Sequence, residues 1–186
     1  MNKYMYHLLI LLMMAMALGC ESKRNQYYNH GVGLASNGDF QQAILSYSKA
    51  IEMDPVYFKS YYNRGTAYLV LSQYDKAEDD LNKAIELNSK CSECYLNLGT
   101  IYNRTEHYPE SIDKYNKALE LNPKLWIAYM NRGRSYYRLE KYDVAMSDYD
   151  KSIEINPNTT DHYQAHKEDL SPEGDAVEFY MAAPND

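Results

Sequence analysis

The strongest constraint on the fold of this 186-residue chain is a repeat of 34 residues. Glycine recurs at this interval, and a tyrosine stands four positions before each of these glycines. Aromatic or leucine residues follow each glycine after 3, 9 and 16 positions, and alanine or serine follows after 12 and 19. The glycines are Gly31, Gly65, Gly99 and Gly133, and the tyrosines are Tyr27, Tyr61, Tyr95 and Tyr129. This many columns in phase over four copies indicate a repeat architecture.

Each copy has the spacing of two helices. In both halves of the copy the recurring positions fall at i, i+4 and i+7, which is one face of a helix. Glycine and alanine on these faces let two helices approach closely, and a proline that follows the second half in three copies ends the helix there. Each copy is therefore expected to be a helical hairpin. One hairpin cannot bury its own apolar face, so the four should stack into an all-α solenoid.

This pattern resembles the tetratricopeptide repeat (TPR), whose length and framework columns match. By phase, the four expected TPR hairpins are residues 24–57, 58–91, 92–125 and 126–159. Residues 160–170 are expected to form a C-terminal capping helix, because a terminal repeat needs a polar outer face. Residues 171–186 contain two prolines and a glycine and are expected to be a flexible tail.

Some positions depart from the TPR pattern. Ser89 replaces the proline after the second repeat, and His30, Arg64 and Arg132 occupy a column that is often leucine. We expect these departures to loosen the packing locally without removing the fold.

Tyrosine supplies 21 of the aromatic residues, beside 3 phenylalanines and 1 tryptophan. A buried tyrosine must bring its hydroxyl to water or to a hydrogen-bond partner, so this composition favours a thin structure. Thirteen of the tyrosines fall in four of the repeat columns. Their rings are expected between helices, with the hydroxyls at the edge of a structure two helices thick.

Residues 1–19 have the pattern of a secretory signal peptide: a positive start at Lys3, then an apolar run from Leu8 to Leu18. The run has 11 residues, too few to span a membrane, which takes about 20. A buried core helix is the alternative, but such a helix would carry polar positions every three or four residues.

The sequence Ala17-Leu18-Gly19-Cys20 resembles the lipobox of bacterial lipoproteins. The resemblance implies cleavage before Cys20, a lipid on Cys20, and a short linker over residues 20–23. By the same resemblance, Glu21 favours the outer membrane if the organism has one. The alternative is an ordinary signal that a cysteine happens to follow.

Composition and motifs speak against catalysis. The formal charge is −7, without the basic face of a nucleic-acid binder. The sequence has no glycine-rich phosphate loop, no GxSxG and no HExxH, so we expect no enzyme activity, cofactor or metal. His162 and His166 are spaced for metal binding but lack a third ligand.

Cys91 and Cys94 form a CxxC motif where the second repeat meets the third. The sequence leaves three interpretations open: packing thiols, a structural disulfide, or a redox or metal site. Zinc would need two further ligands, and a redox enzyme of this kind normally has a βαβ framework.

The TPR resemblance implies a ligand groove lined by the first helices of the hairpins. In this sequence the sixth column of every repeat is an asparagine. Three arginines toward the C-terminal end suit carboxylates on a partner; the alternative is that they pair with acidic side chains of neighbouring helices. The Lys and Asn that clamp chaperone tails are absent, since their positions hold Tyr28 and Val32. The candidate groove residues are Tyr28, Asn29, Tyr62, Asn63, Asn97, Arg104, Asn131, Arg134, Tyr137 and Arg138.

These features together predict a lipid-anchored TPR adaptor at the bacterial cell envelope. Its expected partners are proteins or peptides that are membrane-bound or located in the envelope. One alternative is an assembly factor for a pilus, a secretion system or an outer-membrane complex. A second alternative is a thiol redox protein that uses Cys91 and Cys94.

Overall fold

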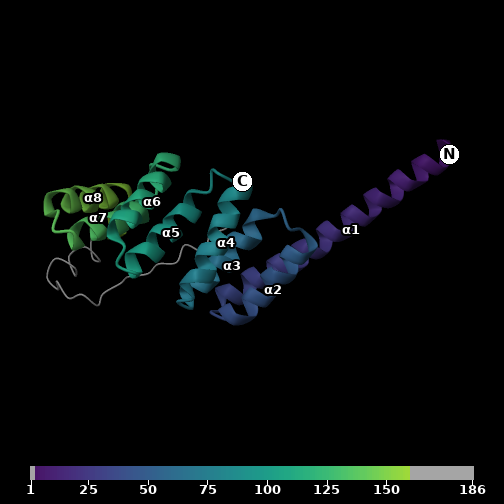
Figure 1. Cartoon of the computed structure of the whole chain (residues 1–186), viewed down its shortest axis with the longest axis horizontal. Coiled ribbons are helices and arrows are strands. Elements are labelled where there is room, and N and C mark those ends of the chain that lie inside the picture. The colour runs from purple at the N-terminus through teal and green to yellow at the C-terminus, as the bar shows by residue number, and fades with distance from the viewer. Residues whose placement is uncertain (1–2, 160–186) are drawn as a thin grey trace. The chain divides into compact units, whose positions relative to one another are not determined.

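The computed structural model describes residues 3–159, which contain eight α-helices and no strand (Figure 1). The all-α class predicted from the repeat is confirmed. The expected capping helix and tail, with His162 and His166, lie outside the described residues. The helices are α1 (Lys3–Ser36), α2 (Phe40–Met53), α3 (Phe58–Val70), α4 (Tyr74–Leu87), α5 (Ser92–Arg104), α6 (Tyr108–Leu121), α7 (Trp126–Arg138) and α8 (Tyr142–Ile155), followed by the 3-10 turn η1 (Pro157–Thr159).

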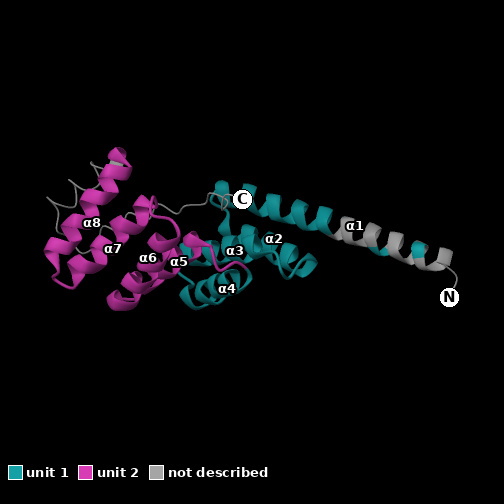
Figure 2. Cartoon of the chain, turned by 90° about the horizontal axis from the view of Figure 1, so that it is seen from above, with its two compact units in different colours: residues 1–87 teal, residues 88–186 magenta. Residues whose placement is uncertain are grey.

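The chain divides into two compact units, residues 1–87 and residues 88–186 (Figure 2). Unit 1 contains the hairpins α1–α2 and α3–α4, and unit 2 contains the hairpins α5–α6 and α7–α8. In each unit the second helix of the first hairpin packs on the first helix of the next one. Each unit is therefore a two-hairpin stretch of an α-solenoid.

The turn inside every hairpin contains one residue in the left-handed backbone region. These residues are 34 positions apart, with φ of 82° at Gly38, 56° at Ser72, 63° at Glu106 and 60° at Glu140. The residue after each one donates its backbone N–H back to the preceding helix, as in the 2.9 Å bond from Asp39 N to Leu34 O. This bond satisfies a carbonyl that the helix end would leave without a partner. Only the first turn uses glycine, the residue that this conformation favours.

The connections that follow the second helix of each hairpin share a side-chain hydrogen bond. An Asp or Asn side chain accepts a hydrogen bond from the backbone N–H two residues later, at 3.2 Å for Asp54 and for Asn88, 3.1 Å for Asn122 and 3.3 Å for Asn156. This turn does not depend on the intervening proline. The connection with Ser89 keeps the same bond, so its missing proline leaves the turn intact.

The recurring glycines lie where the two helices of a hairpin touch. A Cβ on Gly31 would lie 2.6 Å from the Tyr47 ring, and one on Gly99 would lie 2.5 Å from the Tyr115 ring. Both rings are fully buried, so neither can move aside. The close helix contact predicted from the spacing is therefore a contact between a glycine and a tyrosine ring in these two hairpins.

One tyrosine hydroxyl does not reach the edge of the structure as expected. Tyr47 Oη is buried and has no hydrogen-bond partner among the described residues. The equivalent hydroxyl of Tyr115 donates to Thr100 Oγ1 at 3.4 Å. Hairpin α1–α2 has Val32 at the position of Thr100, and valine offers no oxygen.

Helix α1 runs without interruption from the expected signal peptide into the first hairpin, and in Figure 1 it extends far beyond α2. Residues 20–23, expected to be a linker, lie inside this helix because no proline or turn sequence separates them from the repeat. Within residues 3–159, none of the helices combines the length and apolar character that a membrane crossing requires. Signal cleavage and lipid attachment stay predictions.

Candidate protein-binding surface

In unit 1 most of the predicted groove positions belong to the core. Tyr62 is fully buried, Tyr28 is 7% exposed and Asn63 is 3% exposed. Asn63 Nδ2 donates to the Tyr28 hydroxyl at 3.0 Å, which joins α1 to α3. A bulky tyrosine at this position fills the space between neighbouring first helices. These three residues therefore hold the hairpins together in this structure, whereas Asn29 is exposed.

Tyr28 lies in an aromatic cluster at the start of the first hairpin. Its ring meets that of Tyr57 edge-on at 5.3 Å and that of Tyr47 at 6.1 Å. The Arg24 guanidinium lies 4.0 Å from the Tyr57 ring centroid. Burial raises the pKa of Tyr28 to about 12, the nearby Tyr57 adds to this rise, and the hydrogen bond from Asn63 opposes it.

In unit 2 the predicted positions are more accessible. Arg138 is exposed, and Arg104, Arg134 and Tyr137 are half-buried. The Tyr137 ring meets that of Tyr142 edge-on at 5.1 Å. Of the two predicted asparagines in this unit, Asn97 is buried and Asn131 is half-buried.

A polar contact in unit 2 aligns the C-terminal ends of two first helices. Asn103 Nδ2, in the last turn of α5, donates to Ser135 Oγ of α7 at 2.8 Å. Ser135 Oγ also shares a 2.7 Å hydrogen bond with Ser111 Oγ of α6. The bond between Asn103 and Ser135 holds the segments of α5 and α7 that carry Arg104 and Arg134 next to each other.

Arg138 completes this basic group, one helical turn after Arg134 on α7. Arg104 and Arg138 each end their helix, where the helix dipole favours a positive charge. Each of the three arginines already interacts within the protein. A partner carboxylate would therefore share or exchange these interactions. We name Arg104, Arg134 and Arg138 the basic end of unit 2.

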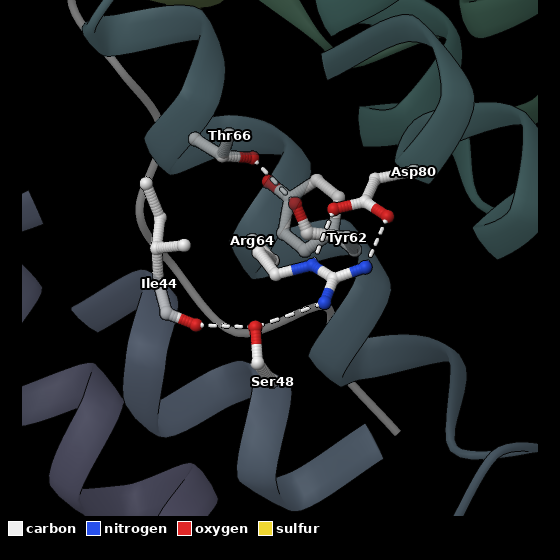
Figure 3. Close-up of polar contacts among 6 residues, drawn as sticks. All are labelled: Ile44, Ser48, Tyr62, Arg64, Thr66 and Asp80. Carbon is white, nitrogen blue, oxygen red and sulfur yellow. Dashed lines mark hydrogen bonds and ion pairs between the residues drawn. The ribbon is translucent and has the colours of Figure 1, made fainter. Parts of the chain in front are cut away.

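The structure also contains a buried ion pair that the sequence analysis missed. Arg64 Nε and Nη2 donate to the two oxygens of Asp80 at 2.7 and 2.8 Å (Figure 3). Arg64 Nη1 donates to Ser48 Oγ of α2 at 2.9 Å, so one guanidinium joins three helices. Asp80 is only 6% exposed. The hydrogen bond with Asp80 raises the pKa of Arg64, with burial acting against it.

Unit 2 repeats this arrangement at equivalent positions. Arg132 Nε and Nη2 donate to the Asp148 carboxylate at 2.8 and 2.6 Å, and its Nη1 donates to Asn116 Oδ1 at 2.6 Å. We expected the arginines in this column to loosen the packing, and that expectation is wrong because a buried aspartate pairs with each one. The aspartate stands 16 residues after the arginine in both repeats, a pairing visible in the sequence when two columns are compared.

Cys91 and Cys94 are joined by a disulfide at the start of α5, with their Cα atoms 5.3 Å apart. Cys91 Sγ also accepts the backbone N–H of Cys94 at 3.2 Å, as a cap of the helix. Both residues are buried. Thiol–disulfide exchange requires access to the sulfur, so this geometry suits a structural bond rather than a redox site. Residues 3–159 also contain no group of three His, Cys, Asp or Glu side chains placed to hold a metal ion.

Comparison with known families decides the nature of the repeat. The profile described as "Tetratricopeptide repeat" matches residues 58–91 and 126–159. A second profile, described as "TPR repeat", matches residues 34–72 and 99–140. Together the matches extend over more than half of the chain. The chain is a tetratricopeptide-repeat protein.

Solved TPR structures share the fold. The chain matches pilF of Pseudomonas aeruginosa with a TM-score of 0.69 at 21% identity, over 81% of this chain and 72% of that one. It matches MamA of Desulfovibrio magneticus RS-1 with a TM-score of 0.66 at 24% identity, over 73% and 76%. It also matches the first TPR of Spaghetti (RPAP3), bound to the HSP90 peptide SRMEEVD, with a TM-score of 0.62 at 26% identity, over 64% and 94%.

No sequence among the curated proteins matches this TPR chain significantly. The similarities to pilF and MamA, at less than 25% identity, support the fold alone.

Proposed function

We propose that this TPR protein is a lipid-anchored adaptor that binds acidic segments of protein partners through the basic end of unit 2. The observation that carries the proposal is the placement of Arg104 in the last turn of α5 and of Arg134 and Arg138, one turn apart, toward the end of α7, in two helices joined by the Asn103–Ser135 hydrogen bond. Guanidinium groups attract carboxylates, whereas the remaining surface of a chain with net charge −7 repels acidic segments, so an acidic segment is directed to the arginines. No catalytic step is part of this function.

The shape of the ligand follows from the same residues. Guanidinium groups bind carboxylates through paired N–H donors, so side-chain carboxylates spaced along an extended peptide suit three arginines on two adjacent helices. The RPAP3 structure shows a TPR holding the short peptide SRMEEVD, which contains three acidic residues. Tyr137 and Asn131 of α7 offer an aromatic ring and an amide to the same segment.

The experiment compares two pairs of substitutions in unit 2. Arg134→Ala with Arg138→Ala removes two charges from the basic end, and Lys117→Ala with Lys151→Ala removes two charges from α6 and α8. We expect the arginine pair to weaken partner capture about 5- to 30-fold, which corresponds to 1–2 kcal/mol, and the lysine pair to leave it unchanged. Capture is measured by crosslinking in the envelope followed by mass spectrometry. If the wild-type protein and both double variants capture the partner equally, with unchanged melting temperatures, the site is excluded.

The anchor is proposed from the lipobox resemblance. Lipid on Cys20 would hold the protein at the envelope, at the outer membrane where the organism has one. Blocking lipoprotein signal cleavage should cause a larger precursor to accumulate, and Cys20→Ser should release the protein from membranes. Normal processing in the first experiment and unchanged membrane association in the second would contradict the anchor while leaving the peptide site intact.

A further inference from the structure

The expected anchor residue is coupled to the first hairpin by continuous helix. Cys20 and Arg24 both lie in α1, one turn apart, which is about 6 Å along the helix axis. No flexible segment separates them, so a lipid on Cys20 would fix the end of the hairpin that faces the membrane.

Arg24 attaches the connection between α2 and α3 to this same end. Its Nη1 donates to Asp54 Oδ2 at 3.0 Å, and its guanidinium stacks 4.0 Å from the Tyr57 ring centroid. Its Nη2 donates to Glu21 at 3.2 Å, on the turn that carries Cys20. The connection Asp54–Tyr57 therefore lies at the level of the anchor, and Arg24 pairs with the two carboxylates of Glu21 and Asp54.

This connection exposes an apolar side chain that the others lack. Val56 is 71% exposed, and Pro55 beside it is exposed as well. The equivalent positions in the other connections hold Lys90, Lys124 and Asn158. All four connections make the same turn through the side chain two residues earlier, so the fold does not require valine here.

We propose that the connection Asp54–Tyr57 rests on the lipid surface beside the anchor, with Val56 among the headgroups. The inference rests on the proposed lipid on Cys20 and assigns the membrane-facing surface of unit 1. An apolar tip next to an anchor suits the boundary between headgroups and acyl chains.

The test uses the full, lipidated chain in vesicles of phosphatidylethanolamine and phosphatidylglycerol that contain a spin-labelled lipid. Val56→Cys is compared with Asn37→Cys, each labelled with an environment-sensitive fluorophore. Asn37 follows the opposite end of α1, about 24 Å from Cys20 along the axis. The introduced thiol is the one available for labelling, because Cys91 and Cys94 are bonded to each other and Cys20 carries the lipid.

We expect the label at position 56 to be quenched at least twofold more than the label at position 37. Inserting Gly-Ser-Gly-Ser after Ser22 should uncouple the hairpin and remove this difference. If both labels are quenched equally in vesicle-bound protein, the connection does not contact lipid and the inference fails while the anchor stands. If the chain does not float with the vesicles at all, the anchor itself fails and the inference falls with it.

Discussion

Replacing Arg64 by leucine tests whether the buried ion pair holds unit 1 together. The substitution removes two charge-assisted hydrogen bonds to Asp80, at 2.7 and 2.8 Å, each worth about 2 kcal/mol. It also removes the bond to Ser48 and leaves an almost fully buried carboxylate without its cation. Burial of the leucine side chain returns about 1–2 kcal/mol. We therefore expect the free energy of unfolding to fall by about 3 kcal/mol, the lower end for one partner of a buried pair.

The third repeat shows which second substitution should restore the stability lost in Arg64→Leu. At the positions equivalent to Arg64 and Asp80 it has Leu98, which is buried, and Lys114, which reaches toward the Tyr102 ring at 5.8 Å. The double variant Arg64→Leu with Asp80→Lys copies this solution. It should recover all but about 1 kcal/mol of the loss, because no carboxylate then stays buried without a partner.

Urea unfolding followed by helical circular dichroism measures all four members of this cycle, with Asp80→Lys as the second single variant. The coupling energy between the two positions should be at least about 2 kcal/mol. A loss below about 1 kcal/mol for Arg64→Leu, or a double variant no better than the two single losses combined, would refute the assignment of Arg64 and Asp80 as a stabilising pair.

Three further predictions concern the packing of the first hairpin. Gly31→Ala should destabilise the protein by about 1–3 kcal/mol because its Cβ meets the Tyr47 ring, whereas Gly33→Ala, with nothing within 4 Å, should stabilise it by up to about 1 kcal/mol in thermal unfolding. Val32→Thr should give the buried Tyr47 hydroxyl a partner and add about 1 kcal/mol, a gain that Tyr47→Phe in the same chain should cancel. Burial raises the pKa of Tyr28 to about 12, so its phenol loses the proton at a lower pH in the unfolded chain than in the folded one. The free energy of unfolding should therefore be unaffected below about pH 10 and fall toward pH 12. The fall should be less steep in Tyr28→Phe.

The repeat columns predicted the helices well because each column reports a local requirement. Glycine is needed where a ring packs against the helix backbone, and Gly31 and Gly99 both meet tyrosine rings there. The prediction needs only the helical period and the size of a side chain, and both can be read from the sequence.

The candidate groove could not be predicted to the same depth. A column fixes the side of the helix on which a residue lies, but not how far a neighbouring helix covers it. Tyr28 and Asn63 occupy groove columns, yet they bond to each other between α1 and α3. The asparagine column shows the variation: Asn29 is exposed and Asn131 is half-buried, whereas Asn63 and Asn97 are buried. The difference lies in packing between helices, which the phase of the repeat does not contain.

The ion pairs Arg64–Asp80 and Arg132–Asp148 could have been predicted by comparing two columns of the repeat with each other. The same two columns hold Arg with Asp in the second and fourth repeats, Leu with Lys in the third, and His30 with Ser46 in the first. His30 Nδ1 and Ser46 Oγ lie 3.0 Å apart, so the first pair is complementary too. The fold therefore accepts polar or apolar chemistry at this contact, provided that the two columns change together.

This pairing also separates a structural arginine on α7 from the two arginines of α7 that we propose for partner binding. Arg132 and Arg134 are two residues apart, so their side chains leave the helix about 200° apart. Arg132 donates to the buried carboxylate of Asp148 of α8. The side of Arg134 continues to Arg138. A substitution at Arg132 should therefore act on stability, and one at Arg138 on partner binding, so the two effects can be measured independently on a single helix.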